Sequence, residues 1–128
     1  IAHALAWPRR VETKVMRLNL AAIARLDFAP VDDTRFPAVG YARRASALGN
    51  AAATVLNSAN EAAVTAFISG RCGFLDISWA VGEMLDMFEG SNFAGLTCMS
   101  LEEIKYLDSR VRDLTDERLT RAPSRPGE

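Results

Sequence analysis

The stretch from Ala51 to Ser69 constrains the fold of this chain more than any other part of it. Placed on a helix it is apolar on nearly every side, and Gly70 ends it. Helices with this pattern lie at the centre of a protein, and the many alanines let neighbouring helices approach closely. We therefore expect a central helix here, with others packed around it. Its polar residues form one stripe, made of Thr54, Asn57, Ser58, Glu61 and Thr65, with Asn60 beside it.

Three further helical patterns accompany this stretch. The first begins at Asp33 or Thr34, either of which can cap a helix, and it carries Pro37 in its first turn. Pro is tolerated there because the missing N–H has no partner inside the helix in any case. Apolar residues then recur at three- and four-residue spacing until Gly49 closes the helix.

The last two helices have their own start signals. Asp76 is the expected N-cap of the third helix, and Gly90 is its expected stop. Ser100 and Glu103 predict a capping box, in which each side chain accepts a hydrogen bond from the backbone N–H of the other residue. The predicted buried stripes are Ile77, Ala80, Val81, Met84, Leu85 and Phe88 in the third helix, and Leu101, Ile104, Leu107, Val111 and Leu114 in the fourth.

Four amphipathic helices with short connections predict an all-α fold, a helical bundle of about four helices. Residues 1–33 are expected to be a connector with one short helix, which Pro8 ends. Residues 34–119 are the predicted helical domain, and residues 120–128 lack periodicity and are expected to be a disordered tail. Position 1 is Ile with no N-cap residue before it, which favours a chain that begins inside a larger protein.

Charge and cysteine content exclude several classes of partner. Fifteen basic and sixteen acidic residues leave a net charge of −1, which gives no electrostatic footprint for nucleic acid or an anionic membrane. Every apolar stretch is interrupted before the ~20 residues that a membrane span needs. Cys72 and Cys98 are too few for a disulfide framework and suggest reduced thiols inside a cell. We expect neither nucleic acid nor membrane as a partner.

Residues with catalytic chemistry are scarce. His3 has no second metal ligand near it, and no Gly-rich phosphate loop occurs. Asn57, Asn60 and Glu61 lie within one helical turn and either bind a ligand or hydrogen-bond a neighbouring helix, and we favour the structural role. A substitution that introduces Asp on this stripe, such as Ser58→Asp, should destabilise the fold less than one on the apolar face. The structural candidates are Asn57, Asn60, Glu61, Asp76, Ser100 and Glu103, with no catalytic, cofactor-binding or metal-binding residue.

Several strings of residues resemble the C-terminal region of the 1-deoxy-D-xylulose 5-phosphate reductoisomerase family. Residues 1–9 (IAHALAWPR) look like the segment that leads into this region, and residues 26–28 (LDF) and 33–37 (DTRFP) resemble the entry to its helical domain. Residues 55–64 (VLNSANEAAV) are similar to that domain's most recognisable stretch, followed by residues 74–77 (FLDI). Departures from the family pattern are Asn19, where Asp is frequent, residues 92–99, and the tail after Leu119.

The resemblance implies the structural C-terminal domain of an NADPH-dependent oxidoreductase and isomerase. Such an enzyme makes 2-C-methyl-D-erythritol 4-phosphate in non-mevalonate isoprenoid biosynthesis, uses Mg²⁺, Mn²⁺ or Co²⁺, and is usually a homodimer. The family's catalytic and nucleotide-binding motifs precede this region, so we expect this piece to be inactive and to bind no cofactor itself. Its partners would be the upstream domains, in the bacterial cytoplasm or a plastid. The alternative is a separate, non-catalytic helical interaction module derived from that enzyme.

Overall fold

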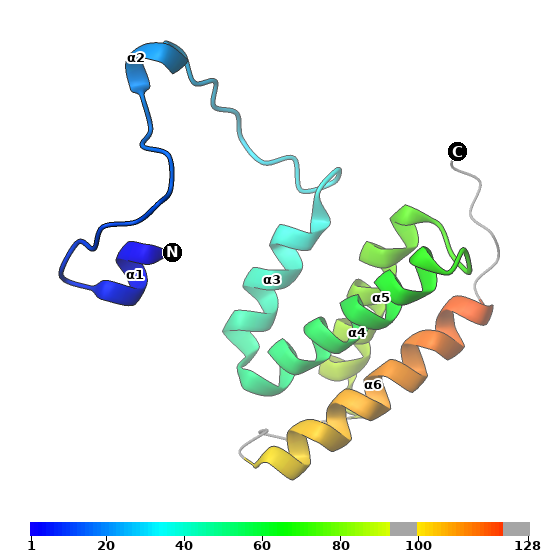
Figure 1. Ribbon diagram of the computed structural model, residues 1–128. Helices are drawn as coiled ribbons and strands as arrows, with labels where there is room; N and C mark the ends of the chain where they lie inside the picture. Colours follow the sequence, from blue (N-terminus) through cyan, green and yellow to red (C-terminus); the bar gives the residue numbers. More distant parts are fainter. Residues whose placement is uncertain (93–99, 122–128) are drawn as a thin grey trace. The chain divides into compact units, whose positions relative to one another are not determined.

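The computed structural model describes residues 1–92 and 100–121. The chain divides into two compact units, Ile1–Pro30 and Val31–Glu128. The first unit holds two short helices, α1 (Ala2–Ala6) and α2 (Leu20–Ile23), seen in blue in Figure 1. No residue of this unit is buried. Its exposed large apolar side chains are Ile1, Leu5, Trp7, Val11, Val15, Met16, Leu18, Leu20, Ile23, Leu26 and Phe28.

The second unit is built from four long helices. They are α3 (Pro37–Leu48), α4 (Asn50–Ile68), α5 (Phe74–Met87) and α6 (Leu101–Arg121), and a short π-helix, η1 (Phe88–Asn92), continues α5. Within residues 1–92 and 100–121 there is no strand, so the expected all-α helical bundle is confirmed.

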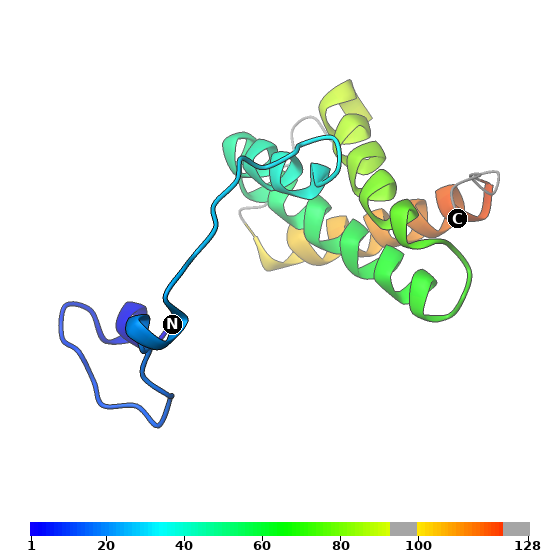
Figure 2. The same cartoon turned by 90° about the horizontal axis from the view of Figure 1, so that it is seen from above.

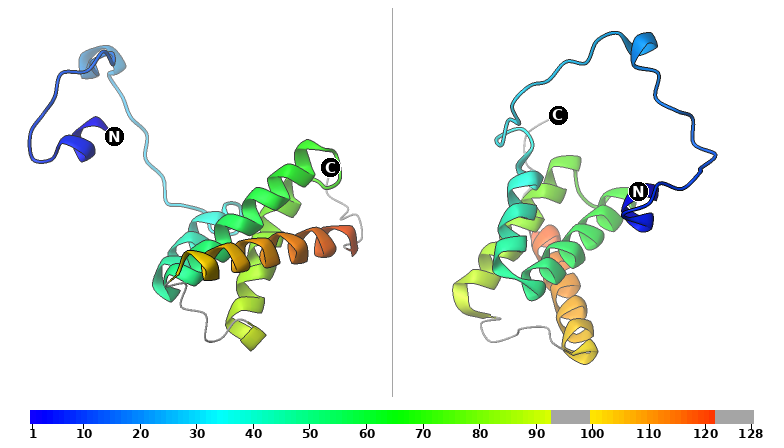
Figure 3. Two further views of the ribbon diagram at one scale, coloured as in Figure 1. Left: turned by 60° about the horizontal axis from the view of Figure 1, so that its bottom comes forward. Right: turned by 90° about the vertical axis from the view of Figure 1, so that its left-hand side faces the viewer.

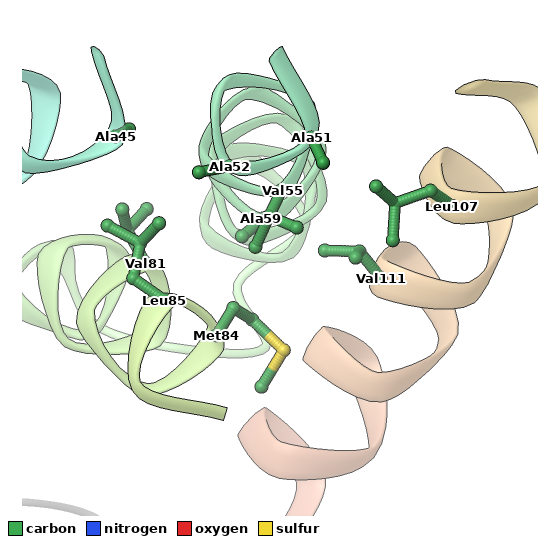
Figure 4. Packing of buried hydrophobic residues seen from close by; sticks show 10 residues of the cluster. All are labelled: Ala45, Ala51, Ala52, Val55, Ala59, Val81, Met84, Leu85, Leu107 and Val111. Atoms are coloured by element: carbon green, nitrogen blue, oxygen red, sulfur yellow. The ribbon is translucent and has the colours of Figure 1, made fainter. Parts of the chain in front are cut away.

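α4 is the central helix, as its apolar surface predicts. It packs against α3, α5 and α6, and Figures 1 and 2 show it between its neighbours from two directions. α6 packs against α4, and the two views in Figure 3 show the two helices inclined to each other. Figure 4 looks along α4, with side chains of the other three helices pointing toward it. This main core contains Ala45, Ala51, Ala52, Val55, Ala59, Val81, Met84, Leu85, Leu107 and Val111.

A second, smaller core lies toward the C-terminal end of α4. Its buried members are Ala63, Ala66, Ala80 and Leu119, and Cys72, Ile77 and Trp79 pack against them. Small side chains dominate the α4 contribution to both cores, so the backbone of α4 lies close to its neighbours. This is the reason why a charge introduced at these alanines would have no room and no water around it.

α3 approaches α5 closely at one glycine. A Cβ atom added to Gly82 would lie 2.7 Å from the hydroxyl oxygen of Tyr41 and 2.9 Å from its Cζ atom. A Cβ atom essentially never lies this close to another heavy atom, so a side chain at position 82 would force the Tyr41 ring to move. Gly82 is itself buried in α5, and Tyr41 of α3 packs against the main core.

Two helix ends differ from the sequence prediction. The N-cap of α3 is Phe36, without a side-chain hydrogen bond, and neither Asp33 nor Thr34 caps it. Asp32 instead accepts hydrogen bonds from the N–H groups of Thr34 and Arg35 in the preceding turn. Gly90 does not end the third helix, because the chain continues through η1 to Asn92.

The C-terminal end also differs in part from the prediction. α6 continues to Arg121, two residues past the predicted limit of the helical domain at Leu119. In this last turn the Thr120 hydroxyl donates a hydrogen bond to the carbonyl oxygen of Asp116. The remainder of the predicted tail, residues 122–128, and the departure at residues 93–99 lie outside the described residues.

Candidate functional site

A polar network joins α4 to α6 on the stripe that the sequence singles out. Ser58 donates a hydrogen bond from Oγ to Oδ1 of Asp108, with 2.6 Å between the oxygens. Arg112, one turn further along α6, donates from Nε to both carboxylate oxygens of Asp108 at 3.0 Å. The four-residue spacing of Asp108 and Arg112 places both side chains on one side of α6, and Ser58 connects this pair to the central helix.

The guanidinium of Arg112 also reaches the central helix directly. Its Nη2 atom donates to Oε2 of Glu61 in a short ion pair. Nδ2 of Asn57 donates to the other oxygen of Glu61 at 3.1 Å. Asn57, Glu61, Ser58, Asp108 and Arg112 thus form one continuous network across the α4–α6 interface, which we call the α4–α6 polar network.

The network holds its acidic members in the charged form. The hydrogen bond from Arg112, then that from Ser58, lowers the pKa of Asp108 below its ordinary value. The hydrogen bond from Arg112, then that from Asn57, lowers the pKa of Glu61 in the same way. The two carboxylates raise the pKa of Arg112 further above its already high value. Groups with these shifts stay charged at neutral pH and do not exchange protons as an acid–base catalyst must.

One prediction about the stripe needs correction. Ser58 is 1% exposed, so it belongs to the buried surface of α4, and an Asp at this position would not be mild. Asn60 is exposed in this helical unit and is not part of the α4–α6 polar network, so its structural role stays a prediction.

The remaining structural candidates act at helix ends. Ser100 and Glu103 form the predicted capping box, with N–H···O distances of 3.0 Å to Glu103 Oε2 and 3.1 Å to Ser100 Oγ. Asp76 is not the N-cap of α5, which is Gly73. Its carboxylate accepts a hydrogen bond from the N–H of Gly73 at 2.8 Å, so it works from the third position of the helix.

The other residues with possible chemistry have packing roles. The rings of His3 and Trp7 meet edge to face, with centroids 5.3 Å apart. Cys72 is half-buried, and burial raises the pKa of its thiol, which makes the thiolate scarcer. In the part of the chain that the structure describes, no three His, Cys, Asp or Glu side chains are grouped to hold a metal ion. The described helices also include none that is long and apolar enough to cross a membrane.

The sequence of this helical unit matches a known protein family. The family model for the DXP reductoisomerase C-terminal domain matches residues 1–114. The chain belongs to this reductoisomerase family. The 1-deoxy-D-xylulose 5-phosphate reductoisomerase of Stutzerimonas stutzeri is 40% identical over 121 residues, which cover 94% of this chain and 29% of that protein.

Solved reductoisomerase structures have the same fold over this region. The enzyme from Zymomonas mobilis in complex with NADPH gives a TM-score of 0.78 at 35% identity, covering 94% of this chain and 31% of that one. A DOX-P reductoisomerase in complex with magnesium gives 0.73 at 35% identity, covering 92% and 30%. The chain therefore spans about 30% of the length of the reductoisomerases it matches.

Sequence reasoning missed the ion pairs that Arg44 and Arg71 make in this reductoisomerase domain. Arg44 of α3 binds Asp86 and Glu89 near the end of α5, each at 2.7 Å. Arg71 binds Asp116 at 3.0 Å and ties the α4–α5 turn to α6. Partners in each case are at least forty residues apart in the chain, and no local spacing identifies them.

Proposed function

We propose that this chain is the C-terminal helical domain of an NADPH-dependent 1-deoxy-D-xylulose 5-phosphate reductoisomerase. The full enzyme would rearrange and reduce its ketose phosphate to 2-C-methyl-D-erythritol 4-phosphate in non-mevalonate isoprenoid biosynthesis. The observation that carries the proposal is the match of residues 1–114 to the C-terminal domain of that family. The helical domain contributes structural support, and the chemistry belongs to the upstream domains.

The cofactor sites of the full enzyme are assigned to domains other than this one. One solved relative is in complex with NADPH and another with magnesium, and both are about three times as long as this chain. We assign NADPH and a divalent cation, Mg²⁺, Mn²⁺ or Co²⁺, to the domains upstream of Ile1. The chain's own polar groups support this division, because those of the α4–α6 polar network are engaged with one another.

Residues 1–33 fit the role of a connector to the catalytic domain. The unit Ile1–Pro30 exposes many large apolar side chains and buries none of its residues. Apolar surface of this extent is favourable only when another surface covers it. The upstream domains of the same enzyme would cover this apolar surface. Residues 34–119 form the helical domain that the connector joins to them. We also propose that the full enzyme is a homodimer that binds neither nucleic acid nor a membrane. Its location would be the bacterial cytoplasm or a plastid.

The test compares the full-length enzyme with the 128-residue chain. Both proteins are incubated with NADPH, 1-deoxy-D-xylulose 5-phosphate and Mg²⁺, and the loss of absorbance at the reduced-nicotinamide band is followed. The full-length enzyme should consume NADPH only when the ketose phosphate is present, and the chain alone should do nothing. Substrate-dependent consumption by the chain alone would overturn the structural role. An inactive full-length protein would favour a separate interaction module instead.

A further inference from the structure

The corner between α4 and α5 presents a compact apolar surface. Phe67 and Ile68 end α4, and Phe74 and Leu75 begin α5, with 40%, 78%, 68% and 64% of their surface exposed. The rings of Phe67 and Phe74 meet edge to face with centroids 5.8 Å apart, which joins the two helix ends into one patch. We call these four residues the corner patch. It lies at the end of α4 away from the α3–α4 junction (Figures 1 and 2).

The charged and polar groups of the same corner are all turned to internal partners. Ser69 donates its hydroxyl to the carbonyl groups of Thr65 and Ala66. Arg71 binds Ser69 Oγ and the carboxylate of Asp116. The carboxylate of Asp76 accepts the N–H of Gly73. The surface left for a partner is therefore apolar, and docking there would require little removal of water from charged groups.

The size of the corner patch indicates which kind of partner fits it. Four side chains of this kind, partly exposed, amount to a patch on the order of 500 Å². A stable complex between separate proteins buries about 800 Å² on each partner, so the patch alone is too small to hold two copies together. Contacts between domains of one chain can be smaller, because the covalent connection supplies a high effective concentration.

We infer that the corner patch docks on the upstream part of the same enzyme and so fixes the helical unit at a second point besides the connector. This inference rests on the proposed function, which supplies the upstream domains. About 70% of the length of the reductoisomerase relatives lies outside this chain, and the family match places that length before it. A complementary apolar surface on the upstream domains is the occupant, because the corner patch is smaller than the surface that a stable complex with a second copy typically buries.

Thiol labelling measures whether the corner patch is covered. Ile68→Cys is introduced into both the full-length enzyme and the 128-residue chain, and the rate of maleimide labelling is read on the tryptic peptide that ends at Arg71. That peptide begins after Arg44 and contains no native cysteine. Because Ile68 is exposed, the substitution should leave the fold intact, which circular dichroism checks. We expect labelling at least about tenfold slower in the full-length enzyme, because the thiol reacts only when the contact opens.

Ser109→Cys on the outer face of α6 is the matched control. Ser109 is exposed, and its tryptic peptide, residues 106–110, also lacks a native cysteine. Its labelling rate should agree between the two proteins within about twofold. Equal rates at position 68 in both proteins would overturn the inference while leaving the enzyme's activity, and so the proposed function, untouched. Labelling at position 68 of the 128-residue chain that slows as its concentration rises would show a second copy as occupant and would also overturn it.

Discussion

Ser58 of α4 donates a hydrogen bond to Asp108 of α6, and the two oxygens lie 2.6 Å apart. Ser58 is 1% exposed and Asp108 is half-buried, so this bond lies at the inner edge of the interface between the central helix and the last one. Arg112 binds the same carboxylate, and through Glu61 it returns to α4. The carboxylate of Asp108 therefore connects α6 to α4 through Ser58, a residue fifty positions away in the chain.

Replacing this carboxylate should destabilise the chain. Asp108→Ala leaves the buried hydroxyl of Ser58 without its acceptor and removes the bidentate partner of Arg112. We expect a loss of about 1–3 kcal/mol in the free energy of unfolding, the cost of an unsatisfied buried polar group. Asp113→Ala, on the exposed side of the same helix, should change it by less than about 0.5 kcal/mol. Chemical denaturation measures both, and equal midpoints for the two variants would contradict the prediction.

The contribution of Asp108 should also depend on pH. Its pKa is lowered in the folded chain, chiefly by the hydrogen bond from Arg112. A group of this kind stabilises the fold at pH values above its unfolded pKa of about 4, and the stabilisation is lost as pH falls through the lower folded value. The stability difference between the wild type and Asp108→Asn should therefore be constant near neutrality and shrink in acid. Glu61 titrates in both proteins and largely cancels. A difference that grows in acid would refute the assignment.

A charge in the second core should abolish cooperative folding. Ala63 is fully buried among Ala66, Ala80 and Leu119, so Ala63→Asp places a carboxylate where no partner or water can reach it. The cost is several kcal/mol, a large part of the stability of a domain this size. Asn60→Asp, on the exposed side of the same helix, is the matched control and should unfold near the wild-type midpoint. If thermal scans followed by circular dichroism gave both variants the same midpoint, the buried face of α4 would be wrongly placed.

Two glycines on neighbouring helices should respond in opposite directions to alanine. Gly82→Ala brings a Cβ atom within 2.7 Å of the Tyr41 hydroxyl and displaces the Tyr41 ring from its packed position, at a cost of about 1–3 kcal/mol. Gly40→Ala, in α3, meets nothing within 4 Å and should stabilise the helix by about 0.5–1 kcal/mol. Adding Tyr41→Phe to Gly82→Ala should restore part of the loss, because the shortest contact disappears. Failure of this double variant to recover any stability would argue against the contact as the cause.

Local signals in the sequence predict much of this domain. The all-α class, the central position of α4 and the capping box of Ser100 and Glu103 follow from residues within one or two helical turns of each other. The Asp108–Arg112 pair is of the same kind, since four-residue spacing places both side chains on one side of any helix. The strings of residues shared with the reductoisomerases indicate the family. The family in turn implies that the catalytic residues lie in the upstream domains.

Other features depend on how the helices are rotated and spaced once they pack. Ser58 and Asn60 are both polar and two residues apart, yet only packing against α6 decides that Ser58 is buried and Asn60 is exposed. The pairing of Arg71 with Asp116 and the need for Gly82 opposite Tyr41 likewise arise between helices. A sequence determines helices through interactions over three or four residues, because those distances are the same in every helix. Contacts between helices have no such constant spacing, so the tertiary structure alone decides them.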